Sequence, residues 1–566
     1  MLKRIFTIIL IFIALVSLDA KNVTKNNQAK KLNQNKNVTG SPSRTHFNIN
    51  NISTWVYNDG QSDIRPDGTS GFVYPKGSNK AAVFQSGLVW GAEINGQRRV
   101  GGATYDSGLR PGRIIGEGPT AVREDEDLEH VRIYRVRRDY ADLNANFSAE
   151  VDDGEGSADE VFAQYELDWN NWPAEYGAPF EDVDGDGSYN PSKDIPGIVD
   201  ADQTIWFVAN DLDTATCNSL YGSNPMGIEM QATYWGYNQA GAVGNVMFRK
   251  YKIINKSGDT FDSMYVSMWA DPDVGDASDD FVGCASSLSL MFAYNGKASD
   301  GIYGLTPPAV GFDFLQGPIV PAPGETAIFD GKLKTNYKNL PMSAHYFFIN
   351  GDADYEDPKL GDYVEGTLYF YSLFVGKYCT LCHGDRIKFP LSGDPLTGTG
   401  WVDGILHQPG DRRQGMVAGS FTMAVGDTQE VVVAEIVAGA FPGVDRLGAI
   451  SLLKFYDLIA QNFYNENAII VSVDDNNIVT DYLLSQNYPN PFNPTTKINF
   501  SITEAGFVKL KVYDILGREV AILINKQLES GKHTVDFNAN KLASGVYYYR
   551  ISIADFVDVK KMLLLK

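Results

Sequence analysis

The sequence predicts a mainly β protein built from β-sandwiches. Short alternations of apolar and polar residues recur along most of the chain, and clusters of Gly, Asn and Asp separate them. The composition agrees, with 55 Gly, 25 Pro, 30 Tyr and 30 Phe, because turns need Gly and Pro and strands favour aromatic residues. Helical spacing is evident only in residues 445–465, where Leu452, Phe455, Ile459 and Phe463 share one stripe.

The charge of the chain excludes some partners and locates the acidity. The 566 residues carry a net charge of −22, so binding to nucleic acid or to an anionic membrane is not expected. Residues 1–20 carry +1 and residues 484–566 carry +4, which leaves −27 for residues 21–483. The length also predicts several domains, because single cores stop growing well below this size.

Residues 1–20 have the layout of a secretory signal peptide. Lys3 and Arg4 precede an apolar run from Ile5 to Leu18, and the segment ends on Ala20. The run is short for a membrane span, so we expect cleavage and no transmembrane segment in the mature chain. Residues 21–45 are rich in Asn and Lys and are expected to be a flexible linker.

Residues 46–465 form the predicted acidic β-rich body, as one or two domains, before a linker at residues 466–483. Alternating segments such as ADQTIWFVAND and DSMYVSMWADPD predict strands with one buried face. TQEVVVAEIVAGA contains a continuous apolar run, which predicts a strand buried on both faces. The expected architecture is a large β-sandwich or jelly-roll-like body, with the helix at residues 445–465 packed on its sheets.

An Asp-rich loop is the first candidate site for a metal ion. Carboxylates at alternate positions followed by Gly can direct several oxygens at one hard cation, and Ca²⁺ is the cation expected to bind such a loop. Lys193 stands where an EF-hand loop requires a bidentate Glu, so a short Asp loop is expected, with a solvated acidic turn as the alternative. The candidate ligands are Asp182, Asp184, Asp186, Asn190 and Asp194.

Two further acidic sets follow predicted strands. Asp271, Asp273 and Asp276 come directly after the strand DSMYVSMW, and a third set comprises Asp352, Asp354 and Asp357. Both sets are expected to bind additional Ca²⁺, to complete the first site, or to be surface charge. The Ca²⁺ would be structural, and it would neutralise part of the negative charge of the body.

The chain contains four cysteines, and two of them allow a second cofactor, a haem. Cys379, Cys382 and His383 have the C-x-x-C-H spacing that attaches a c-type haem, with a local disulfide or a pair of thiols as the alternative. A disulfide between Cys217 and Cys284 is also possible.

Signatures of catalysis are scarce. The chain contains no G-x-S-x-G, H-E-x-x-H or P-loop motif, and no catalytic residue can be assigned. Glu175 near Trp169 and Trp172 is compatible with cleavage of a polysaccharide, although tryptophans in a β-sandwich more often belong to the core.

The last 83 residues contain the most specific pattern. Short alternating strands recur about every ten residues between turns, and seven strands of this kind predict a small immunoglobulin-like sandwich. The segments NYPNPFNP (487–494), VYDILGREV (512–520), SGVYYY (544–549) and KKMLLLK (560–566) resemble the type A C-terminal sorting domain of type IX secretion cargo. The residues that carry the resemblance include Pro489, Asn490, Pro491, Gly517, Gly545, Tyr547 and Lys566.

This resemblance implies export through the periplasm to the outer-membrane surface or the medium, with the translocon and sorting machinery as partners. The body resembles uncharacterised secreted cargo proteins. We therefore expect a calcium-stabilised, non-enzymatic protein with a role in surface adhesion or binding, and surface polysaccharide is a possible partner. The alternatives are an extracellular polysaccharide-degrading enzyme and a mono-haem c-type protein.

Overall fold

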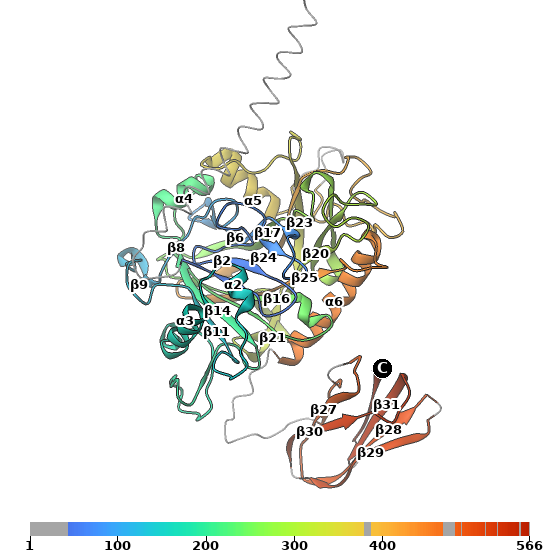
Figure 1. Cartoon of the computed structure of the whole chain (residues 1–566). Coiled ribbons are helices and arrows are strands. Elements are labelled where there is room, and N and C mark those ends of the chain that lie inside the picture. The colour runs from blue at the N-terminus through green and yellow to red at the C-terminus, as the bar shows by residue number, and fades with distance from the viewer. Residues whose placement is uncertain are drawn as a thin grey trace, which may run out of the picture. The chain divides into compact units, whose positions relative to one another are not determined.

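The computed structural model describes residues 43–377, 386–467 and 482–564, apart from residues 488, 489, 516, 529, 554 and 555. The predicted signal peptide and nearly all of the linker that follows it lie outside this range. The chain divides into two compact units, Met1–Ile470 and Val471–Lys566, which we call the body and the C-terminal unit. Both consist mainly of antiparallel strands (Figure 1), as predicted.

Two large antiparallel sheets form the body. Within the described residues, eight strands form the first sheet, in the order β1-β2-β3-β6-β17-β24-β23 with β7 beside β6. Its strands are β1 (Arg44–Phe47), β2 (Thr54–Tyr57), β3 (Gln61–Ser62), β6 (Gln85–Ile94), β7 (Gln97–Gly102), β17 (Phe261–Asp271), β23 (Met342–Ile349) and β24 (Arg412–Met423).

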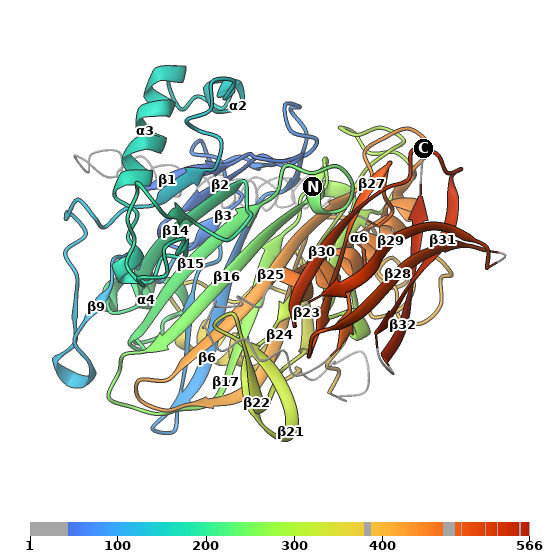
Figure 2. The same cartoon turned by 90° about the horizontal axis from the view of Figure 1, so that it is seen from below.

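The second sheet of the body has nine strands among the described residues, in the order β11-β14-β15-β16-β25-β20-β19-β18 with β8 beside β14. They are β8 (Arg110–Pro111), β11 (Tyr134–Arg137), β14 (Gln203–Asn210), β15 (Ile228–Gly236), β16 (Val246–Asn255), β18 (Asp280–Ala285), β19 (Leu290–Asn295), β20 (Ala309–Gln316) and β25 (Thr428–Ala438). Figure 2 shows β14, β15, β16 and β25 side by side.

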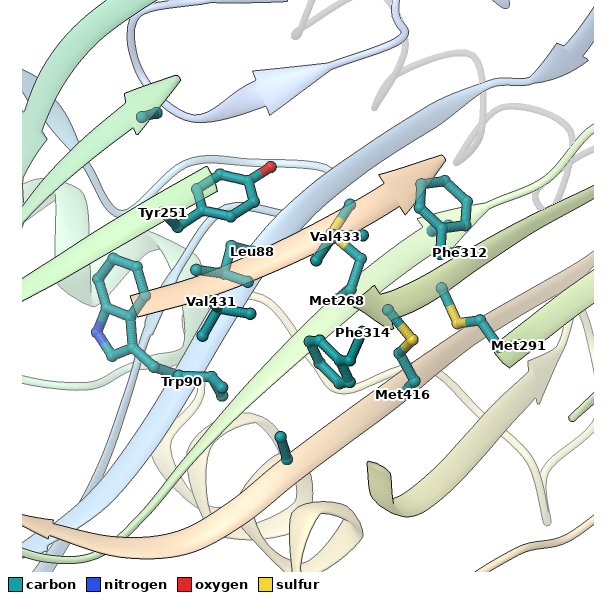
Figure 3. Close-up of a cluster of buried hydrophobic side chains, with 14 of the residues drawn as sticks. Leu88, Trp90, Tyr251, Met268, Met291, Phe312, Phe314, Met416, Val431 and Val433 are labelled. Atoms are coloured by element: carbon teal, nitrogen blue, oxygen red, sulfur yellow. The ribbon is translucent and has the colours of Figure 1, made fainter. Parts of the chain in front are cut away.

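The two sheets enclose one large apolar core. Leu88 and Met268 of the first sheet belong to the same buried cluster as Phe312 and Val431 of the second (Figure 3). Side chains that alternate along each strand supply this layer, as expected for a sandwich. From Gln429 to Ala438, β25 is buried on both faces, in agreement with the apolar run in its sequence.

A buried ion cluster crosses this core. Arg249 of β16 is fully buried, and its Nη2 lies 2.9 Å from the Asp63 carboxylate and also contacts Glu435 of β25. Asp63 follows β3 of the first sheet, so the cluster joins the two sheets. The cation requires these partners because an unpaired charge at such a position is strongly destabilising.

Helices pack on the two large sheets, and two-stranded hairpins lie outside them. The packing of α4 and α5 on the first sheet buries residues such as Leu220 and Phe370. The helices are α2 (Ser148–Asp152), α3 (Ala158–Asn170), α4 (Thr214–Tyr221), the π-helical η7 (Tyr363–Leu368), α5 (Tyr369–Phe374) and α6 (Arg446–Asn467), with short 3-10 turns η2 (Gly118–Thr120), η3 (Ala174–Tyr176), η4 (Val243–Asn245), η5 (Ala277–Asp279) and η6 (Ser286–Leu288). The hairpins pair β4 (Phe72–Val73) with β5 (Ala81–Val83), β9 (Ile114–Ile115) with β10 (Val122–Arg123), β12 (Phe180–Glu181) with β13 (Ile195–Pro196), and β21 (Ile319–Phe329) with β22 (Lys332–Asn339).

The helix α6 was predicted correctly, but of the four residues placed on its apolar stripe only Phe463 is buried. Phe455 is 49% exposed, whereas the buried positions are Ala449, Ile450, Leu453, Asp457, Ala460, Phe463 and Tyr464. The buried stripe includes two alanines and an aspartate, residues that a count of large apolar side chains overlooks. Asp457 faces Asp313 of β20, and burial raises the pKa of both carboxyl groups.

The C-terminal unit is a small sandwich of two antiparallel sheets with an immunoglobulin-like fold. Among the described residues, three strands, β26-β27-β30, form one sheet and four, β29-β28-β31-β32, form the other. The strands are β26 (Leu483–Leu484), β27 (Thr495–Ile502), β28 (Gly506–Asp514), β29 (Glu519–Leu528), β30 (Gly531–Asn538), β31 (Gly545–Ile553) and β32 (Phe556–Leu564). Alternate residues such as Val508, Leu510 and Val512 form its core, as predicted.

Candidate functional sites

The Asp182 loop connects β12 to β13 and brings together three of its five predicted ligands. Carboxylate oxygens of Asp182, Asp184 and Asp194 lie within 4.8 Å of one another. Asp186 and Asn190 are not part of this group; their side-chain oxygens accept hydrogen bonds from Ser188 and Ser192 instead. The loop therefore brings three acidic groups close enough to share one cation.

The carboxylates of the Asp182 loop already have partners within the loop. Asp182 accepts hydrogen bonds from the backbone N–H groups of Gly185 and Gly187, each at 2.8 Å. Asp194 accepts from the backbone of residues 183 and 190, at 3.0 and 2.7 Å. The Lys193 ammonium lies 2.6 Å from Asp184 and lowers the pKa of that carboxyl group. These contacts stabilise the negative charge without an ion.

A second group of carboxylates lies at the end of the first sheet. Oxygens of Asp271, Asp273 and Asp411 lie within 4.8 Å of one another. Asp271 ends β17 and Asp411 immediately precedes β24, and the register that pairs Ala270 with Gln414 places both residues at the same sheet edge. We call these three residues the Asp271 cluster.

The composition of the Asp271 cluster differs from the predicted set. Asp276 does not join it, because its side chain accepts a hydrogen bond from the backbone of Ser278 at the start of η5. Asp411 was missed, because it is distant in sequence and stands in no Asp-rich motif. The sequence PGDRRQGM that contains it gives no sign that its carboxylate faces β17.

Asp271 is the least compensated member of the cluster. Asp271 is 6% exposed, and its Oδ2 accepts a hydrogen bond of 2.6 Å from the Tyr105 hydroxyl. Its Oδ1 is buried and has no hydrogen-bond partner among the described residues. Burial, together with the charges of Asp273 and Asp411, raises the pKa of Asp271 well above its ordinary value.

Arg413 provides the nearest cation, and its guanidinium group forms ion pairs with two neighbouring carboxylates. Its Nη1 lies 3.0 Å from Asp411, and its Nη2 lies 2.9 Å from Asp357. Neither of these contacts reaches the Asp271 Oδ1. The cluster therefore has the chemistry of a hard-cation site, namely several carboxylate oxygens around a buried oxygen that has no donor.

The third predicted acidic set does not converge. Asp352 lies 3.4 Å from the His407 ring, and Asp357 pairs with Arg413. Asp354 instead lines a pocket of about 170 Å³, which is bounded by β23, α5 and the segment after residue 386. Phe347, Tyr355, Tyr369 and Trp401 supply its aromatic walls, and Lys377 also lines it.

One group resembles the residues of a hydrolytic triad but is buried. The Ser53 hydroxyl lies 3.2 Å from Nε2 of His46, and Nδ1 of His46 lies 3.6 Å from Asp153. Ser53 and His46 are 2% and 3% exposed, so a substrate cannot reach the hydroxyl. Burial and the charge of Arg135 hold the pKa of His46 well below its ordinary value. We interpret the group as a polar network of the core.

The tryptophans near Glu175 are structural. The Trp172 indole donates a hydrogen bond of 2.7 Å to the Pro179 carbonyl, and the Trp169 indole donates one of 3.2 Å to the Pro191 carbonyl. Trp172 is 4% exposed and belongs to a buried cluster. The Trp169 ring packs against the same cluster, so both tryptophans contribute to the packing of this region.

The described cysteines are not bridged. Cys217 and Cys284 are buried free thiols, which corrects the disulfide considered between them. Burial raises the pKa of Cys284 to about 12, so this thiol is unreactive at neutral pH. Cys379, Cys382 and His383 lie outside the described residues, and haem attachment there stays a prediction.

In the C-terminal unit, the predicted sorting residues organise the last strand. The Asn490 side chain accepts a hydrogen bond of 2.7 Å from the Leu563 backbone of β32. Gly517 adopts a φ of 76° in the turn closed by Asp514 and Arg518, a conformation that favours glycine. Tyr547 donates a hydrogen bond of 2.8 Å to the Ala543 carbonyl, and Gly545 begins β31. Pro489 and Lys566 lie outside the described residues.

Residues 486–565 match the family model of the secretion system C-terminal sorting domain. This match confirms the resemblance found in the sequence, and it identifies the chain as type IX secretion cargo with a type A sorting domain. The protein is exported through the periplasm to the outer-membrane surface or the extracellular space. Among the described residues, no helix is both long enough and apolar enough to span a bilayer.

Solved structures give only remote similarity. A polysaccharide lyase matches at 7% identity and a TM-score of 0.17, over 59% of this chain and 34% of the lyase. The dimeric latent PorU of Porphyromonas gingivalis matches at 9% identity and 0.14, over 64% and 31%. PorZ, a surface component of the type IX secretion system of the same organism, matches at 11% and 0.12, over 64% and 43%. The chain thus spans less than half of each structure, and TM-scores this low do not indicate a shared fold or function. No curated protein matches the chain.

Proposed function

We propose that this exported protein is a non-enzymatic binding protein of the cell surface or the medium, with a body stabilised by Ca²⁺. The Asp271 cluster is the observation that carries the proposal. It combines three carboxylates with a buried oxygen that has no donor, at the junction of β17 and β24. A cation there would offset the repulsion among the carboxylates and hold two strand ends together.

The secreted location favours Ca²⁺ over other cations. Extracellular calcium modules bind with dissociation constants of about 10⁻⁴ to 10⁻³ M, which suits the calcium concentration outside cells. Ca²⁺ accepts irregular coordination by carboxylate oxygens, whereas Mg²⁺ requires nearly octahedral geometry. The Asp182 loop is a second proposed site, and it is the weaker one because its carboxylates are already hydrogen-bonded.

A binding role fits the described sites better than catalysis does. Glycoside hydrolysis usually requires two facing carboxyl groups, and Asp354 is the only carboxylate among the residues that line the aromatic pocket. The group of Ser53, His46 and Asp153 is closed to substrate. These observations support a surface or adhesion role over polysaccharide cleavage.

A thermal melt of the purified mature protein in EDTA, in Ca²⁺ and in Mg²⁺ tests the calcium proposal. Binding at 100 times the dissociation constant would add about 2.7 kcal/mol to the free energy of unfolding and raise the Tm by several degrees. A similar gain in Mg²⁺ would contradict the choice of metal. An unchanged Tm in both ions would refute a structural cation.

The export route has its own test, which is independent of calcium. Deletion of residues 485–566 removes every described strand of the C-terminal unit except β26, and it leaves the body intact because that unit has its own core. We expect the truncated protein to accumulate in the periplasm, detected by fractionation and immunoblotting. Its continued appearance outside the cell would show that the body carries a second export signal.

A further inference from the structure

The aromatic pocket of the body has the composition of a ligand site. It lies at β23, which has no further strand beyond it at this edge of the first sheet among the described residues. The Phe347 and Tyr355 rings stack with centroids 4.6 Å apart and an angle of 22° between their planes. Trp401 meets Phe347 edge to face at 6.4 Å, so the rings form a rigid apolar surface.

Polar groups with unused hydrogen-bonding capacity surround this surface. No hydrogen bond within the described residues engages the Tyr355 hydroxyl, the Trp401 indole N–H or the Asp354 carboxylate. The Lys377 ammonium lies 3.9 Å from the centroid of the Tyr369 ring, and this contact leaves its N–H donors available. The His345 ring is already engaged, by the Pro390 carbonyl and the Gln414 side chain. The pocket therefore offers donors and an acceptor next to apolar rings.

These properties select one class of ligand. A hydrocarbon would remove the four polar groups from water without replacing their hydrogen bonds, which is unfavourable. An anion would meet Asp354 as well as Lys377, on a protein of net charge −22, and a cation would meet Lys377. A neutral ring with several hydroxyl groups satisfies the polar groups and places its C–H face on the aromatic surface.

Building on the binding role proposed above, we infer that this pocket binds one sugar ring of a neutral saccharide. The volume of about 170 Å³ suits a single ring with the rest of the chain in solvent. A free sugar and the end of a surface glycan share this chemistry. Extracellular glycans are available to a protein at this location.

Calorimetric titration of the mature protein tests the inference. The probes are the methyl glycosides and the hexasaccharides of glucose, mannose, galactose and N-acetylglucosamine. We expect at least one to bind, and Trp401→Ala to weaken that binding at least tenfold. Binding of the hexasaccharide as tightly as its methyl glycoside would identify the end of a glycan, because the remaining rings stay in solvent, and binding of the methyl glycoside alone would identify a free sugar.

Asp354→Ala keeps the inference testable if Trp401→Ala does not fold, because Asp354 is exposed. Its matched control is Glu356→Ala, an exposed acid of the same loop that does not line the pocket. We expect only the first to weaken binding. Failure of all probes to bind, or equal binding by both variants, would overturn the inference. The melting response to Ca²⁺, measured on the same variants, should be unchanged, which separates this test from that of the calcium site.

Discussion

The Asp182 loop and the Asp271 cluster each bring three aspartates within 4.8 Å, yet they differ in what surrounds the carboxylates. In the Asp182 loop, backbone N–H groups and Lys193 engage all three carboxylates. In the Asp271 cluster, the central carboxylate is buried and one of its oxygens has no donor among the described residues. The sequence of the loop resembles a calcium motif more closely, but the negative charge of the cluster is less well compensated by the protein itself.

The difference shows that the spacing of aspartates does not by itself measure the need for an ion. An Asp-rich turn can stabilise its own charges through local hydrogen bonds, because such side chains readily bond to backbone N–H groups two or three residues ahead. A carboxylate at a buried strand end has no such N–H groups and depends on distant residues. Burial alone does not distinguish the two sites, because Asp194 of the loop is buried as well. They differ in that Asp194 accepts two backbone hydrogen bonds, whereas the buried Oδ1 of Asp271 has no donor among the described residues.

The largest expected effect is the loss of the calcium response in Asp271→Asn. The amide removes the central charge of the cluster, so the gain in Tm on addition of Ca²⁺ should fall to near zero. In EDTA the same variant should be at least as stable as the natural protein, because it relieves the repulsion with Asp273 and Asp411. Paired thermal melts measure both effects.

Asp182→Asn is the matched control, since it removes one charge from the exposed loop by the same chemical change. It should retain most of the calcium-dependent gain in Tm. The reverse result, with the gain lost in Asp182→Asn and retained in Asp271→Asn, would assign the structural ion to the loop and invert the comparison.

The pH dependence of stability in EDTA is expected to be a smaller effect than the loss of the calcium response. Its sign should be opposite at the two sites. The pKa of Asp271 is raised by burial and by its acidic neighbours, so its contribution is fully present below the ordinary pKa of about 3.9 and is lost as the pH rises toward the folded value. The pKa of Asp184 is lowered by Lys193, so its contribution is present above the ordinary pKa and is lost as the pH falls.

Urea unfolding between pH 4 and pH 8 measures this difference, with Asp271→Asn as the reference. The natural protein should lose stability relative to the variant as the pH rises, and Ca²⁺ should restore it. Burial also raises the pKa of Asp457 to about 7, so this residue contributes a pH dependence of the same sign. The variant Asp457→Asn removes that contribution and allows the effect of Asp271 to be measured separately. An unchanged difference between the natural protein and Asp271→Asn across this range would contradict the raised pKa assigned to Asp271.

The sequence predicted those features that local pattern determines. The double-sided burial of β25, the existence of α6 and the sandwich of the C-terminal unit all follow from the periodicity of apolar residues. The sorting segments were recognisable because their residues are specific. The Asp182 loop was found because its ligands are adjacent in the chain.

What the sequence could not supply depends on contacts between distant residues. Asp411 joins Asp271 only through the register of β17 and β24, and Asp276 leaves the group because it caps a turn. The buried face of α6 includes Asp457, whose partner Asp313 is on β20. The walls of the aromatic pocket likewise come from segments up to 56 residues apart in the chain, from His345 to Trp401. Periodicity carries no information about any of these pairings.

The smallest expected effect is that of Lys193→Gln, which removes the ion pair with Asp184. The pair is exposed, and exposed ion pairs contribute little to stability, so the Tm in EDTA should change by no more than about 2 °C. The backbone N–H groups that hold Asp182 and Asp194 are unaffected, so the loop should keep its shape.

The same variant also probes the affinity of the loop for a cation, because it frees one carboxylate. If the calcium-dependent gain in Tm grew by several degrees, Lys193 would be acting as a competitor for the ion. The loop would then bind calcium as the Asp271 cluster is proposed to do, and the unpaired oxygen of Asp271 would no longer be the feature that decides between the two sites.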